Sequence, residues 1–307
     1  MDVKQEINLP AQMTSDIRLR RHELGYLELI DKPTRAELSE YYERNYFQNE
    51  AGSYRKSYSE LERLVIGLRI AQRENQIYVF RGGRTPGSLL DVGCGEGFVL
   101  SHFSKLGWSV TGLDFSKAGV ERMNPDHACQ VQQGDVFELL DRQIESAKKY
   151  DVVWLGNVLE HVLDPVELLR SLRQLTLGNG LLLVTVPNDG NSYHEYLYQQ
   201  GLIPTRWWVA IPDHISYFTA DSLRRIVERT GWNCLTVHGD FPIDWFLAND
   251  VANFLTDKSR GSAAHEARLR IEYLIAQAGL DKANRFYESI AEVGLGRNLT
   301  AYLRPNS

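Results

Sequence analysis

The sequence predicts an α/β fold in which a mostly parallel β-sheet carries helices on both faces. From residue 86 onward, short apolar runs alternate with segments of helical periodicity, an alternation typical of parallel sheets. A glycine-rich turn joins the first apolar run to a helix at residues 89–98, written LLDVGCGEGF. Acidic residues follow several of the runs, and the carboxyl ends of parallel strands meet at one edge of a sheet.

The N-terminal part of the chain, residues 1–83, is predicted to be a mainly helical segment. A short strand is expected at 25–30. A helix is expected from Thr34, because the Lys-Pro-Thr sequence ends the preceding segment and provides the N-terminal cap of the helix. A second helix has an apolar stripe over residues 61–71 and ends at a Gly-Gly pair. An aromatic cluster that includes Tyr46 is expected either to pack on the main domain or to form a lid over a bound cation.

The main domain is predicted to cover residues 86–240 and 294–304. Its seven strands are expected at the run that ends in the glycine turn and at 108–113, 129–133, 150–155, 181–186, 232–237 and 298–303. Residues 241–293 are too long for a simple connection. They are predicted to form a helical insertion that serves either as a substrate cap or as the contact of a homo-oligomer.

Composition predicts a soluble protein without a nucleic-acid or membrane partner. The net charge of -6 provides no basic surface for nucleic acid. No apolar run is long enough to cross a membrane, and the first residues lack the apolar core of a signal peptide. Cys94, Cys129 and Cys234 are expected to be small buried hydrophobic residues in a reducing compartment. The predicted location is therefore the cytoplasm.

The spacing of the glycines indicates the kind of ligand. A dinucleotide site needs a small residue where this chain has Phe98, so Phe98 argues against a pyrophosphate at the turn. Asp114 follows the second strand, where an acceptor-only carboxylate could bind both ribose hydroxyls of an adenosine. These residues favour an adenosyl ligand without a phosphate.

Several motifs together resemble the class I S-adenosylmethionine-dependent methyltransferases. The resemblance rests on the acid-G-x-G-x-G turn at residues 91–97, Asp114, the Gly-Asp pair at 134–135 and LEHVLDP at 159–165. It implies a Rossmann-like, seven-stranded sheet, S-adenosyl-L-methionine as cofactor and S-adenosyl-L-homocysteine as product. Looser similarity at GYLELIDKPTRAELSEYYERNYF, DHISYFTADSL and GLGRNLTAYL points to enzymes of surface-polysaccharide and sugar biosynthesis. That similarity implies a sugar-like acceptor.

The resemblance also assigns residues to the cofactor. Asp135 is placed near the adenine amino group, and the backbone N–H of Val136 is placed against the adenine ring. The full set of expected cofactor-binding residues is Asp91, Gly93, Gly95, Gly97, Asp114, Phe115, Asp135, Val136, Asn157 and Tyr46. No metal site is predicted, because no Cys-x-x-Cys pair and no cluster of His, Asp and Glu at ligand spacing is evident.

Two histidines are candidates for catalysis. His214 lies in the loop after the fifth strand and His161 lies just beyond the fourth, both on the ligand side of the sheet. Each is expected either to accept a proton from the acceptor hydroxyl or to serve as a hydrogen-bonding residue, with the structural role favoured for both. Trp207 and Trp208 are expected either to stack on a sugar ring or to pack in the core.

The predicted function is transfer of a methyl group to a small molecule, most readily a hydroxyl of a sugar or sugar nucleotide in glycan biosynthesis. A nicotinamide-dependent reductase or epimerase is the alternative enzyme class, and it is disfavoured by Phe98 and by the lack of a Tyr-x-x-x-Lys pair after the fourth strand. A subunit that binds S-adenosylmethionine without catalysis is the remaining alternative.

Overall fold

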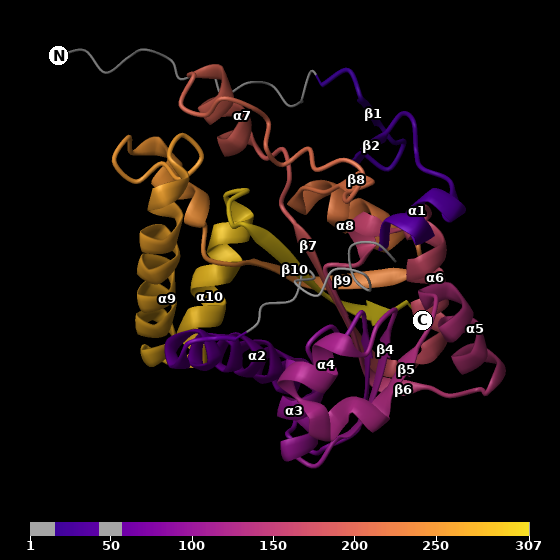
Figure 1. Cartoon of the computed structure of the whole chain (residues 1–307). Helices are drawn as coiled ribbons and strands as arrows, with labels where there is room; N and C mark the ends of the chain where they lie inside the picture. The colour runs from indigo at the N-terminus through magenta and orange to yellow at the C-terminus, as the bar shows by residue number, and fades with distance from the viewer. Residues whose placement is uncertain (1–15, 43–56, 307) are drawn as a thin grey trace.

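A seven-stranded sheet forms the centre of the molecule (Figure 1). The computed structural model describes residues 16–42 and 57–306. The strand order is β5-β4-β3-β6-β7-β10-β9, and every neighbouring pair is parallel except those that involve β10, which runs antiparallel to β7 and β9. The strands are β3 (Ser88–Val92), β4 (Ser109–Asp114), β5 (Val131–Gln133), β6 (Tyr150–Gly156), β7 (Thr176–Pro187), β9 (Trp232–Gly239) and β10 (Asn298–Pro305). The predicted Rossmann-like fold class is confirmed.

Helices cover both faces of this sheet, because its central strands are apolar on both sides. Alternate residues of β7 belong to different cores: Leu182 and Val184 face one layer, whereas Leu181 and Leu183 face the other. The first layer contains α5 (Val136–Glu145), α6 (Pro165–Leu175) and α8 (Ala220–Arg229). The second contains α2 (Glu60–Arg81) and α3 (Phe98–Lys105).

The remaining helices lie in the connections between strands, with two α-helices between β9 and β10. In Figure 1, α9 (Gly261–Gln277) and α10 (Leu280–Glu292) stand beside each other and meet α2, on the opposite side of the sheet from α5 and α6. The other helices in the described ranges are α1 (Arg35–Tyr42), α4 (Ala118–Met123), α7 (Ser192–Gln199) and the short 3-10 helices Pro125–Gln130, Leu159–His161, Ile243–Ala248 and Lys258–Arg260. No helix among the described residues is both long and apolar enough to span a lipid bilayer.

A second, small sheet ties the N-terminal segment to the main domain. It consists of β1 (Leu19–Arg21), β2 (Leu27–Leu29) and β8 (Ser216–Tyr217), in that order and antiparallel throughout. The sequence indicates β2 through its apolar alternation, but the partner strand β8 lies almost 190 residues later in the chain. The N-terminal segment therefore holds in place the loop that precedes β8.

Two local expectations differ from the structure. The residues before β5, including Cys129, form a 3-10 helix rather than strand, and Cys129 is exposed. Its prediction as a buried residue is therefore wrong, because a short helix turns the side chain outward. The strand predicted at 181–186 is longer than expected, since the Leu-Gly-Asn-Gly stretch before it continues β7 back to Thr176.

Candidate active site

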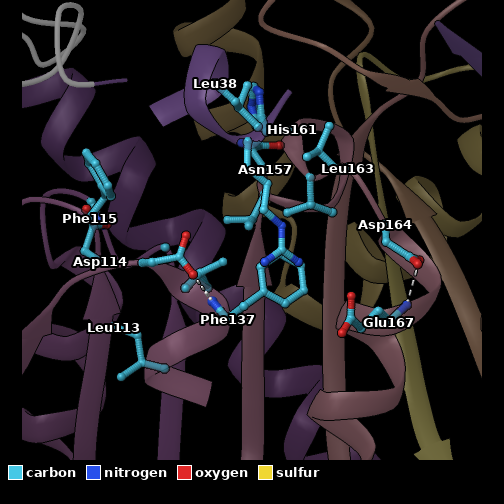
Figure 2. A pocket seen from close by; sticks show the side chains of 17 residues that line it. Leu38, Leu113, Asp114, Phe115, Phe137, Asn157, His161, Leu163, Asp164 and Glu167 are labelled. Carbon is cyan, nitrogen blue, oxygen red and sulfur yellow. Dashed lines mark hydrogen bonds between the residues drawn. The ribbon is translucent and has the colours of Figure 1, made fainter. Parts of the chain in front are cut away.

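One cavity lies at the carboxyl ends of the parallel strands β3, β4 and β6. Its volume is about 360 Å³, within the usual range for small-molecule sites. Figure 2 shows Asp114 and Phe115 on one side of it, Asp164 and Glu167 on the other, and His161 with Leu38 at its top. Much of the lining is apolar, and the polar groups are concentrated where the strands end.

The glycine-rich turn forms part of the cavity wall. Gly93 and Gly95 line it, and both have positive φ, which glycine adopts without strain. A Cβ on Gly93 would lie 2.3 Å from Cγ2 of Val158, so no larger residue fits there. Gly97 also has a positive φ, but it packs against Val120 and is not among the described residues that line the cavity.

Asp114 connects this turn to the end of β4. Its Oδ2 accepts the N–H of Gly95 at 2.7 Å, and its Oδ1 accepts the N–H of Ser116 at 2.9 Å. Each carboxylate oxygen has two lone pairs, so one on each oxygen remains for a ligand. Asp114 therefore stabilises the turn and can also accept hydrogen bonds from a pair of hydroxyl groups in the cavity.

Asp91 is buried behind Asp114 and does not belong to the described cavity lining. Burial, together with the negative charge of Asp114, raises the pKa of Asp91 to about 8. Burial also raises the pKa of Asp114, while the N–H groups of Ser116 and Gly95 act in the opposite direction. Asp91 therefore favours its protonated form at neutral pH.

The other residues assigned to the cofactor also lie at strand ends. Asp135, Val136, Asn157 and Phe115 all line the cavity. Asp135 is the N-cap of α5, because its Oδ1 accepts the N–H groups of Phe137 and Glu138 at 2.9 and 3.1 Å. Asn157 has φ +53 and begins the turn after β6.

The N-terminal segment covers the top of the cavity. Arg35 and Leu38 of α1 line it, and Lys32 donates a hydrogen bond to the backbone oxygen of Leu163 at 3.2 Å. Tyr46, which the sequence places in a lid, lies outside the described residues. Tyr58 donates a 2.6 Å hydrogen bond to Glu96 in the glycine-rich turn, so the start of α2 also reaches this region.

The two candidate histidines lie beside each other. His161 lines the cavity, whereas His214 stands behind it, with ring centroids 5.1 Å apart. The Nδ1 atom of His161 is 2.7 Å from the backbone oxygen of Asp213, and Nδ1 of His214 is 2.9 Å from Oδ2 of Asp189. Glu160, which the sequence did not single out as a ligand or catalytic group, is buried next to them, with Oε1 3.6 Å from Nε2 of His161.

Trp207 and Trp208 belong to a separate apolar cluster with Leu197 and Leu247. Trp208 is 2% exposed and stacks on His194, and Arg297 lies over the ring of Trp207. Neither tryptophan lines the described cavity. Of the two expectations for this pair, the structure supports core packing.

Comparison with known proteins identifies the family. The model of the methyltransferase domain matches residues 69–237, which is more than half of the chain. The chain is also similar to the ubiquinone biosynthesis O-methyltransferases of Histophilus somni, at 38% identity over 112 residues, and of Caulobacter sp., at 35% over 111 residues. These matches cover 34% of this chain and 47% and 44% of the two relatives, so the chain spans a little under half of their lengths.

A solved structure of a SAM dependent methyltransferase from Archaeoglobus fulgidus is similar over 86% of this chain and 98% of its own, with a TM-score of 0.47 and 16% identity.

The cofactor that the family implies fits the cavity. Gly93 and Gly95 present backbone to the cavity, and Asp114 has acceptor capacity for two hydroxyl groups. The carboxyl group of Asp114 at the cavity wall suits a ligand that carries positively charged groups. Given this fit and the extent of the family match, the chain belongs to the methyltransferase domain family, and its cofactor is S-adenosyl-L-methionine.

Proposed function

We propose that this protein transfers a methyl group from S-adenosyl-L-methionine to a hydroxyl group of a small-molecule acceptor. One observation carries the proposal. A single cavity has the glycine turn and Asp114 at one end and His161 at the other. A ligand held at the first end would present its reactive group toward the neighbouring polar side chains of Glu160, His161 and His214, which can act on a second molecule. A binding subunit without catalysis would not need these side chains.

The chain's own residues bind and orient the reactants. When bound, the cofactor supplies an electrophilic methyl group on a positively charged sulfur. Asp114 would hold the ribose hydroxyls, Asp135 and Val136 would contact the adenine, and the Gly93–Gly95 turn would carry the amino-acid part. Holding two reactants in line can lower a barrier by about 7–11 kcal/mol, which is more than a general base contributes. Positioning is therefore the main catalytic contribution.

The histidine pair activates the acceptor. A hydroxyl is a poor nucleophile at neutral pH, so a group that favours its deprotonated form is needed. His161 touches the cavity and His214 stands behind it, oriented by Asp189. We assign the activation of the hydroxyl to this pair, with His161 in contact with the acceptor and His214 acting from behind.

The acceptor is proposed to be a hydroxylated aromatic compound. The named relatives methylate oxygen in ubiquinone biosynthesis, and the apolar lining at Leu38, Val162 and Leu163 suits a flat apolar molecule. The sugar-like acceptor that the sequence predicts is the second candidate; the two tryptophans expected to stack on a sugar ring lie outside the described cavity lining. A homo-oligomer and a cytoplasmic location stay predictions.

A transfer assay with radiolabelled methyl groups tests the proposal. Purified protein is incubated with a panel of phenols and catechols and, in parallel, with sugars and sugar nucleotides. Labelled product from either panel supports methyl transfer, and the panel that reacts decides the acceptor class. His161→Gln is expected to lower turnover by about 10²-fold or more with S-adenosylhomocysteine affinity unchanged. Equal turnover in that variant would remove His161 from the mechanism.

A further inference from the structure

Three potential metal ligands converge beside the cavity. Glu160, His161 and His214 each offer one ligand atom, and these atoms all lie within 4.8 Å of one another. His161 and Glu160 come from the 3-10 helix that follows β6, whereas His214 comes from the loop before β8. A bound ion, with metal–ligand distances of about 2.0–2.2 Å, would draw them slightly closer. One of the three, His161, is open to the cavity.

Hydrogen bonds orient both imidazoles for ligation. A backbone oxygen can only accept, so Nδ1 of His161 donates its proton to Asp213 at 2.7 Å. The carboxylate of Asp189 likewise accepts a hydrogen bond from the Nδ1–H of His214 at 2.9 Å, and Arg297 lies 3.3 Å from its other oxygen. In both rings the proton on Nδ1 leaves a lone pair on Nε2. Metal-binding histidines are usually held in this way, by a carboxylate or a carbonyl on the second nitrogen.

Glu160 provides the second, independent observation. Its side chain is 1% exposed, and neither carboxylate oxygen has a hydrogen bond to another residue in the described parts of the chain. A buried charge without compensation is costly, and such groups are normally paired or coordinate a metal. A divalent cation between Glu160 and the two imidazoles would compensate this carboxylate.

We propose that Glu160, His161 and His214 bind a divalent first-row transition metal ion next to the cofactor cavity. Two imidazoles and one carboxylate suit Mn²⁺, Fe²⁺, Co²⁺ or Zn²⁺, whereas Mg²⁺ prefers oxygen ligands. Three protein ligands leave at least one coordination position open. That position faces the cavity on the side of His161 and is available to an oxygen of the acceptor.

This inference rests on the proposed function and deepens it. A hydroxyl bound to a divalent ion loses its proton more readily, because the positive charge stabilises the alkoxide or phenolate. The proton passes to solvent, and the oxygen then forms its bond to the methyl carbon as the carbon–sulfur bond breaks and its electron pair stays on sulfur. An acceptor with two adjacent oxygens, such as a catechol, would bind this ion through both.

Titration of the metal-stripped full chain, without an affinity tag, with Co²⁺ tests the site. Calorimetry gives stoichiometry and affinity, and visible absorption reports coordination by nitrogen and oxygen. The wild type is expected to bind one ion, and Glu160→Gln, His161→Gln and His214→Gln are each expected to abolish binding or weaken it strongly. Asp189→Asn, which only orients His214, is expected to weaken binding by about 10–100-fold. His127→Gln, outside the cluster, serves as the matched control and is expected to bind normally.

Two further measurements separate this site from the proposed function. Circular dichroism checks that each variant is folded, and Glu160→Gln is the most informative because it removes only a buried charge. Affinity for S-adenosylhomocysteine is expected to be unchanged in the three ligand variants and in Asp189→Asn. Equal Co²⁺ affinity in the wild type and the three ligand variants would overturn the metal site. Methyl transfer that persists in stripped protein with chelator would overturn its role in the reaction while leaving the transferase function intact.

Discussion

Asp114→Asn gives a quantitative test of the cofactor site. In the wild type each oxygen of Asp114 accepts one backbone N–H, at 2.7 and 2.9 Å, and retains one lone pair for a ribose hydroxyl. Asparagine has a single acceptor oxygen, so at least one of the two hydroxyl contacts is lost. A hydrogen bond to a charged group contributes about 1.5–3 kcal/mol. The dissociation constant of S-adenosylhomocysteine is therefore expected to rise roughly 10- to 150-fold.

Isothermal titration calorimetry of the wild type and the variant measures this effect. Asp126→Asn removes an equivalent charge from an exposed position outside the cavity and is expected to bind normally. A second ligand, S-adenosylhomocysteine without its 2′-hydroxyl, separates the ribose contact from distortion of the Gly95 turn. The wild type should bind the ligand with the complete ribose more tightly than the ligand without the 2′-hydroxyl. In Asp114→Asn most of this difference in affinity should be lost. A difference that persists undiminished in the variant would refute the assignment of Asp114 to the ribose.

Three further predictions concern the pH dependence of stability, the binding of S-adenosylhomocysteine and the packing of the core. Burial lowers the pKa of His238 to about 4, so below about pH 6.5 the unfolded chain binds a proton that the folded chain does not. Unfolding free energy should therefore fall by roughly 3 kcal/mol as the pH drops from 6.5 to 4, and His238→Gln should flatten that slope in urea titrations at several pH values. Gly93→Ala should abolish S-adenosylhomocysteine binding in calorimetry, because its Cβ would overlap Val158, whereas Gly178→Ala, which meets open space, should bind normally. Ile77→Ala should lower the unfolding free energy by about 2–5 kcal/mol in chemical denaturation, since Ile77 is fully buried, and a change below about 1 kcal/mol would contradict the packing of α2 on the sheet.

The positions of the strands along the chain and the end of the sheet that carries the site follow from local sequence patterns. Short apolar runs, glycine turns and acidic residues at strand ends are short-range features, and each reports on a few neighbouring residues. Gly93 and Asp114 could be placed in the cavity this way, because a parallel sheet brings successive strand ends to one edge. The same logic placed His161 and His214 on the correct side of the sheet. It could not say whether their rings meet.

Long-range packing decided the remaining features. The pairing of β2 with β8 joins segments almost 190 residues apart, and it fixes the loop that carries His214. Trp208 is buried by packing with the rest of its cluster, not by any pattern of its own.

The sequence by itself determined the fold class, the glycine turn and the acid at the end of β4, because each depends on backbone conformation and on the alternation of apolar residues. Only the tertiary structure brought Glu160 and His161 together with His214 and left the Glu160 carboxylate buried without a hydrogen bond from another described residue. The physical reason is that a contact between residues 53 positions apart depends on how a loop, a small sheet and a strand end pack together. No short stretch of sequence contains that information.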